Sequence, residues 1–273
     1  MVYCMNKKIK KITIFPGTNK LGEKENFEKI NIEKGQAVAI VGCTGSGKSQ
    51  LLYDIERLAQ RDTKSGRFFE VNDKKPDKEI RFDPKRKLIA SLAQSMNFLT
   101  DLSVEKFLEL HLEARGKKIE KKIIEMVIQK ANEIAGEAIS PNMNLLNLSG
   151  GQSRALMISD VANISDSPII LIDELENAGI KKEKAIEILL KKEKIILIVT
   201  HDPSLALSAD KRIIIENGGI VTVLNTTSKE KKIAHYLNWI ENYSLNIRDH
   251  IRKGQRIEHI GIHCKPTQNK EEL

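Results

Sequence analysis

Apolar residues follow two different periods along this chain. Short runs that are apolar throughout are typical of strands buried on both faces of a parallel sheet, and they occur at 37–41, 169–172 and 195–199. Further strands are predicted at 9–15, 26–34, 68–71 and 87–93. Between Ser103 and Ile134 apolar residues recur every three or four positions and predict helices, which Gly116 divides. The pattern indicates an α/β fold with these helices inserted as a separate small layer.

A glycine-rich loop follows the strand at 37–41. The segment 42–49 matches the phosphate-binding pattern G-x-x-x-x-G-K-[ST], and a helical segment follows it. Glycines let backbone N–H groups approach phosphate oxygens, and the next helix points its positive dipole end at the same anion. Lys48 would place a charge on the β- and γ-phosphates, and the Ser49 hydroxyl could ligate Mg²⁺. The residues predicted to hold the nucleotide are Gly42, Cys43, Thr44, Gly45, Ser46, Gly47, Lys48, Ser49 and Gln50.

Three polar residues follow two of the buried strands. Asp173 and Glu174 come directly after the run 169–172, at the carboxyl end where open α/β sheets bind ligands. Asp173 could hold Mg²⁺ through water, and Glu174 could polarise an attacking water as general base. His201 follows the strand 195–199 and should lie at the same edge. An ordinary strand end that enters an acidic loop is the alternative interpretation.

Two other positions are candidates for contact with a nucleotide. The segment Leu148–Gln152 opens a helix, and amides at a helix N-terminus form an anion site. By itself the sequence Ser149-Gly150-Gly151 usually marks a loop. Phe15, at the end of the first strand, could stack an adenine base or pack in the core.

In this order, the motifs resemble the nucleotide-binding cassette of the ABC ATPase family over residues 9–224. The loop 42–49 is similar to the Walker A motif, and Leu148–Gln152 matches the LSGGQ signature without a change. The run 169–173 is similar to Walker B. The remaining motif residues are the Q-loop glutamine Gln94, the catalytic carboxylate Glu174 and the switch histidine His201.

The resemblance implies a fold, cofactors and a partner. The fold would be a P-loop NTPase of the ABC type, with a mixed sheet core, an antiparallel β subdomain and an inserted helical subdomain at about 95–150. The cassette would span 1–225. Family members form head-to-tail dimers of identical or related cassettes that hold two ATP molecules with Mg²⁺. Each ATP lies between the Walker A loop of one subunit and the signature of the other, and the signature residues here are Ser149, Gly150, Gly151 and Gln152. Gln94 would touch Mg²⁺, and His201 would contact the γ-phosphate.

Two positions depart from the family pattern. Ile180 stands where the loop after Walker B usually carries Asp, which puts the usual communication across the dimer in question. Gln50 stands where Thr is commonest, which is a mild change.

Composition narrows the range of partners. The net charge is +8, but lysines are spread among glutamates, and no arginine–aromatic interleaving is present, so nucleic acid is disfavoured. The three cysteines are scattered, which argues against a disulfide framework. With no apolar run of membrane-spanning length and no signal peptide, we expect a cytoplasmic protein, or one peripheral at the inner face of the cell membrane, without direct insertion.

The segment 226–273 is predicted to be a C-terminal helical extension. Its apolar stripe at helical spacing would pack back on the cassette or dock a partner, and it comprises Ile233, Leu237, Ile240, Ile247 and Ile251. His259, His263 and Cys264 suggest a metal, but no fourth ligand has clear spacing.

The sequence leaves two functions open. The chain could be the ATP-binding subunit that energises a separate membrane-spanning subunit, and the segment 98–104 is similar to transporter cassettes. Alternatively, it could be a soluble ABC ATPase acting on an enzyme, a cofactor-assembly complex or a nucleic acid. We favour the transporter subunit, and we keep the soluble ATPase as the alternative because the altered loop near Ile180 and the added tail point to it. The cassette alone does not decide the partner.

Overall fold

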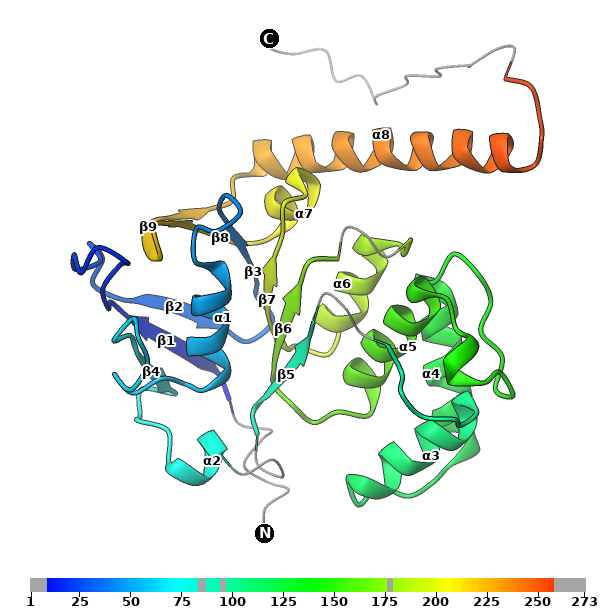
Figure 1. Cartoon of the computed structure of the whole chain (residues 1–273), viewed down its shortest axis with the longest axis horizontal. Helices are drawn as coiled ribbons and strands as arrows, with labels where there is room; N and C mark the ends of the chain where they lie inside the picture. The colour runs from blue at the N-terminus through cyan, green and yellow to red at the C-terminus, as the bar shows by residue number, and fades with distance from the viewer. Residues whose placement is uncertain (1–8, 83–86, 94–96, 176–178, 258–273) are drawn as a thin grey trace.

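A six-stranded sheet forms the centre of the fold in the computed structural model, which describes residues 9–82, 87–93, 97–175 and 179–257 (Figure 1). In spatial order its strands are β5 (Ile89–Leu92), β6 (Ile169–Asp173), β7 (Ile195–Val199), β3 (Ala37–Val41), β8 (Lys211–Glu216) and β9 (Gly219–Asn225). Neighbours from β5 to β8 run parallel, and β9 is antiparallel to β8. The predicted mixed sheet is confirmed.

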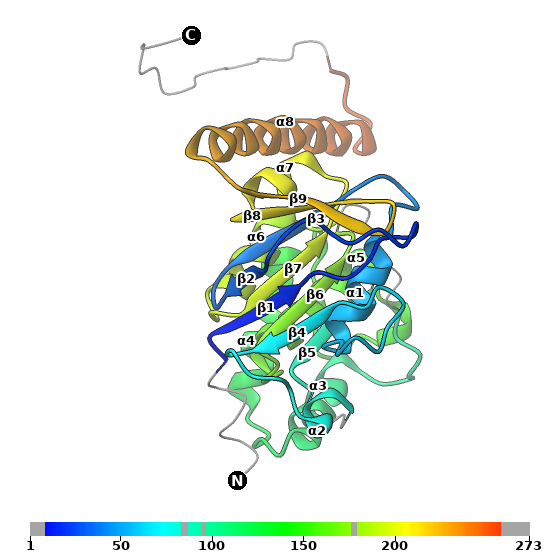
Figure 2. The same ribbon diagram turned by 90° about the vertical axis from the view of Figure 1, so that its left-hand side faces the viewer.

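A smaller antiparallel sheet packs beside it. Its order is β2-β1-β4, with β1 at Lys11–Phe15, β2 at Ile30–Glu33 and β4 at Phe68–Val71. Helix α1 (Lys48–Glu56) lies between the two sheets, and its apolar side packs in one core with this sheet and one face of β3 (Figures 1 and 2). The second strand is shorter than the predicted 26–34, because residues 26–29 lie outside the sheet and Lys34 begins a turn.

Four helices cover the opposite face of the large sheet. They are α3 (Val104–Ala114), α4 (Lys121–Ile134), α5 (Gly150–Asn163) and α6 (Lys182–Leu190), with a 3-10 turn η3 at Leu145–Asn147. Side chains of β3 alternate between the two cores, as the period of a strand requires: Val38 and Ile40 face α1, and Ala37 and Ala39 face this helical layer. The chain breaks between α3 and α4 at Gly116, as predicted, whereas the subdomain boundaries stay predictions.

Three helices lie outside these layers. The short α2 (Lys78–Phe82) was not predicted, because none of its residues is buried and no apolar period marks it. Helix α7 (Pro203–Ser208) follows β7, and α8 (Ser228–Arg252) lies across it (Figure 1). In the part of the chain that the structure describes, no helix is long and apolar enough to cross a membrane.

Helix α8 packs through only part of its predicted stripe. Among the described side chains of the helix, Ala234 and Asn238 are buried, Leu237 and Ile247 are half-buried, and Ile233, Ile240 and Ile251 are exposed. The small side chain of Ala234 lets α8 approach the cassette closely, and α8 is in contact with α7. Glu241 forms an ion pair with Lys182 of α6, and Asn238 donates to Glu183 of α6. The described part of the segment forms a helix at Ser228–Arg252, and three of the five stripe residues stay exposed, while the extent of the extension stays a prediction.

A candidate site for nucleotide binding and hydrolysis

The phosphate loop is shaped by a close approach between two turns. Gly47 caps α1 with a left-handed φ of 106°, and a Cβ at this position would lie 2.6 Å from the Cα atom of Gly218. Gly218 belongs to the turn between β8 and β9, and its N–H donates to the Ser46 carbonyl at 2.6 Å. Only glycine satisfies both the backbone angle and the contact, so the loop and the turn hold each other in place.

The cradle has the chemistry that phosphate requires. Lys48 is buried, and its Nζ donates to the carbonyl oxygens of Gly42 (2.7 Å) and Cys43 (3.0 Å). Ser46 Oγ is also buried and has no hydrogen-bond partner among the described residues. The N-terminus of α1 adds backbone donors and a positive dipole end at the same place. These donors fit an anionic phosphate, and the exposed Ser49 hydroxyl next to them could reach a cation.

Sheet order brings the other catalytic candidates to the same edge. Strands β6, β7 and β3 are neighbours and parallel, so Glu174, His201 and the phosphate loop follow adjacent carboxyl ends. His201 Nε2 lies 3.7 Å from Glu174 Oε1, which is near enough for electrostatic attraction but too far for a hydrogen bond. Glu174 has a left-handed φ of 53°, and its N–H donates to the Val199 carbonyl at 3.0 Å. Such a backbone angle is costly for glutamate and persists because the neighbouring strand holds it.

Asp202 organises the segment that carries His201. Its carboxylate caps α7 by accepting from the N–H groups of Ser204 and Leu205, and it forms an ion pair with Lys182. Burial raises the pKa of Asp202, but the hydrogen bonds from Lys182 and Ser204 and the positive charge of Lys182 together outweigh burial, so the pKa lies below its ordinary value. The charged aspartate therefore anchors the chain directly after the histidine.

The signature residues start a helix on the other side of the sheet. Ser149 and Gln152 form a reciprocal capping box at the start of α5, with bonds of 3.2 and 2.9 Å. Gln152 Nε2 also donates to the Ala138 carbonyl, so both polar atoms of this side chain form hydrogen bonds within the chain. Ser149 and Gly150 are exposed. Since α1 and α5 pack on opposite faces of the large sheet, a second molecule could reach this signature from outside.

Arg154, which the sequence analysis missed, connects several of these motifs. It lies on α5 two residues after the signature, and its guanidinium donates to the Glu174 carbonyl at 2.7 Å and to the Ala93 carbonyl at 3.3 Å. Ala93 directly precedes Gln94. No sequence signal marks this role, because the burial of Arg154 and both of its carbonyl partners depend on the tertiary fold.

Some predicted positions lie outside the described residues. They are Gln94, residues 176–178 of the loop after Glu174, and His259, His263 and Cys264 of the tail. Ile180, at the end of that loop, is buried in the helical core and forms a bridge with Ala135. Its apolar side chain thus serves packing. Within the described ranges, no group of three histidine, cysteine or acidic residues could hold a metal ion.

Comparison with known proteins identifies the family. The family model described as ABC transporter matches residues 28–177, which is more than half of the chain. The chain belongs to the ABC transporter family. Its sheets and helical layer are those of an ATP-binding cassette.

Individual relatives agree with this assignment. An uncharacterized ABC transporter ATP-binding protein of Methanocaldococcus jannaschii is 50% identical, and the match covers 93% of this chain and 97% of that protein. The energy-coupling factor transporter ATP-binding protein EcfA1 of Mycoplasma mycoides is 28% identical over 89% of this chain and 59% of that protein. A dimeric, post-hydrolysis ATP-binding cassette bound to ADP and Pi shares the fold, with a TM-score of 0.57 and 22% identity, over 80% of this chain and 99% of that one.

Proposed function

We propose that this cassette hydrolyses Mg·ATP as a head-to-tail dimer and energises a transporter whose membrane-spanning part is a separate subunit. The observation that carries the proposal is the shared sheet edge, where Glu174, His201 and the phosphate loop meet at the ends of neighbouring strands. The nearly full-length match to an ABC transporter ATP-binding protein supports the transport role.

Each residue has a distinct task in this proposal. The phosphate loop and Lys48 bind and orient the phosphates, and Glu174 polarises the attacking water as general base. His201 lies beside that carboxylate, where it can donate to the γ-phosphate. Ser49 and Asp173, together with Gln94, would hold Mg²⁺, which neutralises charge on the phosphate oxygens when bound. The signature of a second molecule would complete the site, because Ser149 and Gly150 are exposed at the start of α5.

The general base gives the sharpest test of hydrolysis. We expect Glu174→Gln to bind ATP within about threefold of the parent but to lower kcat at least about a hundredfold, since general-base catalysis typically supplies that factor. Phosphate release and calorimetry measure the two quantities. Glu113→Gln, an exposed carboxylate on α3, is the matched control and should keep parental kinetics. Parental turnover in Glu174→Gln would remove this residue from the role of base.

The same variant tests the assembly and the partner. With Mg·ATP, Glu174→Gln should sediment as a dimer, because ATP stays trapped between two cassettes that cannot hydrolyse it. Recovery of the tagged variant from native membranes together with a multi-span protein would support the transport role. Recovery from the soluble fraction with an enzyme or nucleic acid would support the alternative of a non-transport ABC ATPase.

A further inference from the structure

Residues 17–25 form a closed loop between β1 and β2, which we call the clip. Its two ends are joined by the N–H of Gly17, which donates to Glu25 Oε2 at 2.7 Å, and by the N–H of Glu25, which donates to the Gly17 carbonyl at 3.1 Å. Thr18 and Lys24 form an antiparallel bridge inside it. The clip is therefore a structured element with a defined shape.

The tip of the clip lies against the phosphate loop. The backbone N–H of Lys20 donates to the Asn217 carbonyl at 2.8 Å, in the turn that packs on Gly47. Its side-chain Nζ donates to the carbonyl of Gly45, inside the phosphate loop, at 2.7 Å. Lys20 is exposed, so its ammonium can reach a bound molecule. No nucleotide-binding motif includes this lysine.

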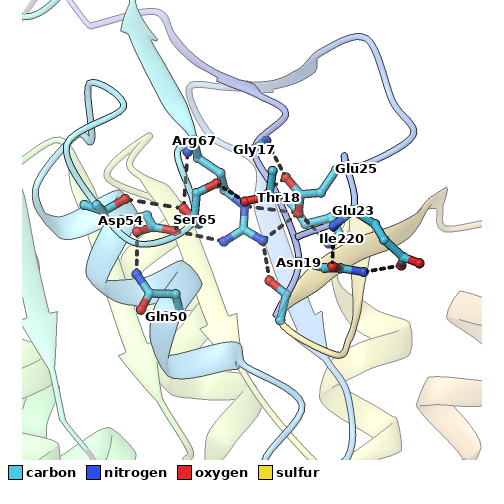
Figure 3. Close-up of polar contacts among 12 residues, drawn as sticks. Gly17, Thr18, Asn19, Glu23, Glu25, Gln50, Asp54, Ser65, Arg67 and Ile220 are labelled. Carbon is cyan, nitrogen blue, oxygen red and sulfur yellow. Dashed lines mark hydrogen bonds and ion pairs between the residues drawn. The ribbon is translucent and has the colours of Figure 1, made fainter. Parts of the chain in front are cut away.

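A buried cluster of three charged residues anchors the clip to the rest of the fold (Figure 3). We call this cluster the brace, and it consists of Arg67, Glu25 and Asp54. Arg67 is fully buried, and its guanidinium lies between Glu25 of the clip, at 2.5 Å, and Asp54 of α1, at 2.8 Å. It also donates to the Gly218 carbonyl at 2.7 Å. The brace thus joins the clip, the helix after the phosphate loop and the turn beside that loop.

The other contacts of the brace point to positioning more than to stability. Glu25 also accepts from the N–H of Ile220 at 2.6 Å, and Asp54 accepts from Gln50 Nε2 at 2.8 Å and Ser65 Oγ at 2.7 Å. Burying one arginine with two carboxylates has a large desolvation cost, and such clusters are weak evidence for added stability. Directional bonds from Arg67 to three separate elements instead specify how those elements sit relative to one another.

We propose that Lys20 is a ligand of the nucleotide phosphates, presented by the clip, and that Arg67 and Glu25 are positioning residues that hold the clip at the phosphate loop. Lys48 and Lys20 each rest their ammonium on carbonyl oxygens of the same loop. A phosphate chain carries several negative charges and is a stronger acceptor than a carbonyl, so ATP draws both ammonium groups to itself. The inference rests on the proposed function, because it deepens the same ATP site.

Replacement of the lysine tests the first half of the proposal. We expect Lys20→Met to raise the Kd and KM for ATP about tenfold, as expected for loss of a hydrogen bond to a charged group, with kcat within about twofold. The melting temperature should not move, because the side chain is exposed. Lys20→Arg should restore most of the affinity. Lys24→Met, on the same clip, is the matched control and should bind ATP as the parent does. Parental Kd and KM in Lys20→Met would overturn the assignment.

A double-mutant cycle tests the positioning role. Glu25→Gln keeps the shape of the side chain and removes its charge, so it should raise the Kd for ATP of the folded protein. In the Lys20→Met background the same change should raise the Kd by a smaller factor, because the clip then has no ligand to present. Equal factors in the two backgrounds would overturn the positioning role. If Glu25→Gln does not fold, Arg67→Lys replaces it in the cycle with Lys20→Met. Equal increases in the Kd for ATP in the two backgrounds would again overturn the positioning role.

These results separate the inference from the function on which it rests. A parent chain that binds ATP without hydrolysing it would contradict the proposed function, while calorimetry on the Lys20 variants would still decide the inference. A parent chain that hydrolyses ATP with Lys20→Met unchanged would contradict the inference alone.

Discussion

The phosphate loop and helix α8 show two different ways in which an element is held in this protein. At the loop, backbone and side chains from α1, the β8–β9 turn and the clip converge within hydrogen-bonding distance. Helix α8 contacts the cassette through a narrow side, with Ala234 1% exposed while Ile240 is 56% exposed. We therefore expect changes at the loop to act on nucleotide binding and changes at α8 to act on attachment of that helix.

The largest effect is expected at the contact between Gly47 and the β8–β9 turn. Gly47→Ala would place a methyl group 2.6 Å from the Gly218 Cα atom and force alanine into a left-handed backbone, so the loop must shift. We expect ATP affinity to fall at least about a hundredfold, because the amides that cradle phosphate lose their geometry. Calorimetry measures it. Gly45→Ala also forces alanine into a left-handed backbone, at a φ of 79°, but its new methyl group meets no atom within 4 Å, so it should lose less affinity. Equal losses would show that the contact with Gly218 is unimportant.

An intermediate effect is expected at Lys182, which joins three helices. It pairs with Asp202 at the start of α7 and with Glu241 of α8 at 2.6 Å. Lys182→Met should lower the free energy of unfolding by about 2 kcal/mol, because it removes charged hydrogen bonds from a partly buried site. Trp239, the only tryptophan, lies on α8 and stacks on Tyr243, so its fluorescence reports this helix while circular dichroism reports the whole fold. In Lys182→Met, the unfolding transition followed by Trp239 fluorescence should have its midpoint at a lower urea concentration than the transition followed by circular dichroism.

The same pair predicts the direction of a pH effect. Because the pKa of Asp202 is lowered in the fold, the unfolded chain binds this proton first, and stability falls as the pH drops below about 4. Lys182→Met removes the largest of the contributions that lower this pKa, so the loss of stability at low pH should be smaller than in the parent. Lys181→Met, an exposed lysine directly before Lys182 at the start of the same helix, is the control and should change neither stability nor its pH dependence. A steep acid loss in Lys182→Met would contradict the assignment.

The smallest effect is expected on the outer stripe of α8. Ile240→Ser should change the free energy of unfolding by less than about 0.5 kcal/mol, because the side chain is already more than half exposed. Ala234→Asp, six residues earlier on the packed side, should destabilise the helix strongly by burying a charge. Urea titration of Trp239 fluorescence compares the two. A large loss in Ile240→Ser that depends on protein concentration would show that a second molecule covers the stripe.

The sequence was most informative where a local rule decides the structure. The strands at 37–41 and 195–199 could be predicted to the residue, because a run of aliphatic residues bounded by polar ones is buried on both faces. The phosphate loop likewise follows from its glycines. The helix at Lys78–Phe82 could not be predicted, since no apolar period marks it.

Contacts between residues far apart in the sequence could not be predicted from it. The stripe of α8 was visible, but which side of the helix packs depends on Ala234 and on ion pairs with residues far away in the chain. Arg154 looked like an ordinary helix residue until the fold placed the carbonyls of Glu174 and Ala93 beside it. The partners of Arg67 lie 42, 13 and 151 positions away, and no spacing rule connects them.

The sequence by itself determined the α/β class and the family and predicted the chemistry of the site, because glycine spacing, strand runs and strand-end carboxylates express local requirements of backbone and ligand. The tertiary structure alone decided that the clip reaches the phosphate loop, that Arg67 joins three elements, and that α8 leaves most of its apolar stripe exposed. These features depend on where the sheet order and the core bring distant residues together, and one-dimensional periodicity carries no information about such distances.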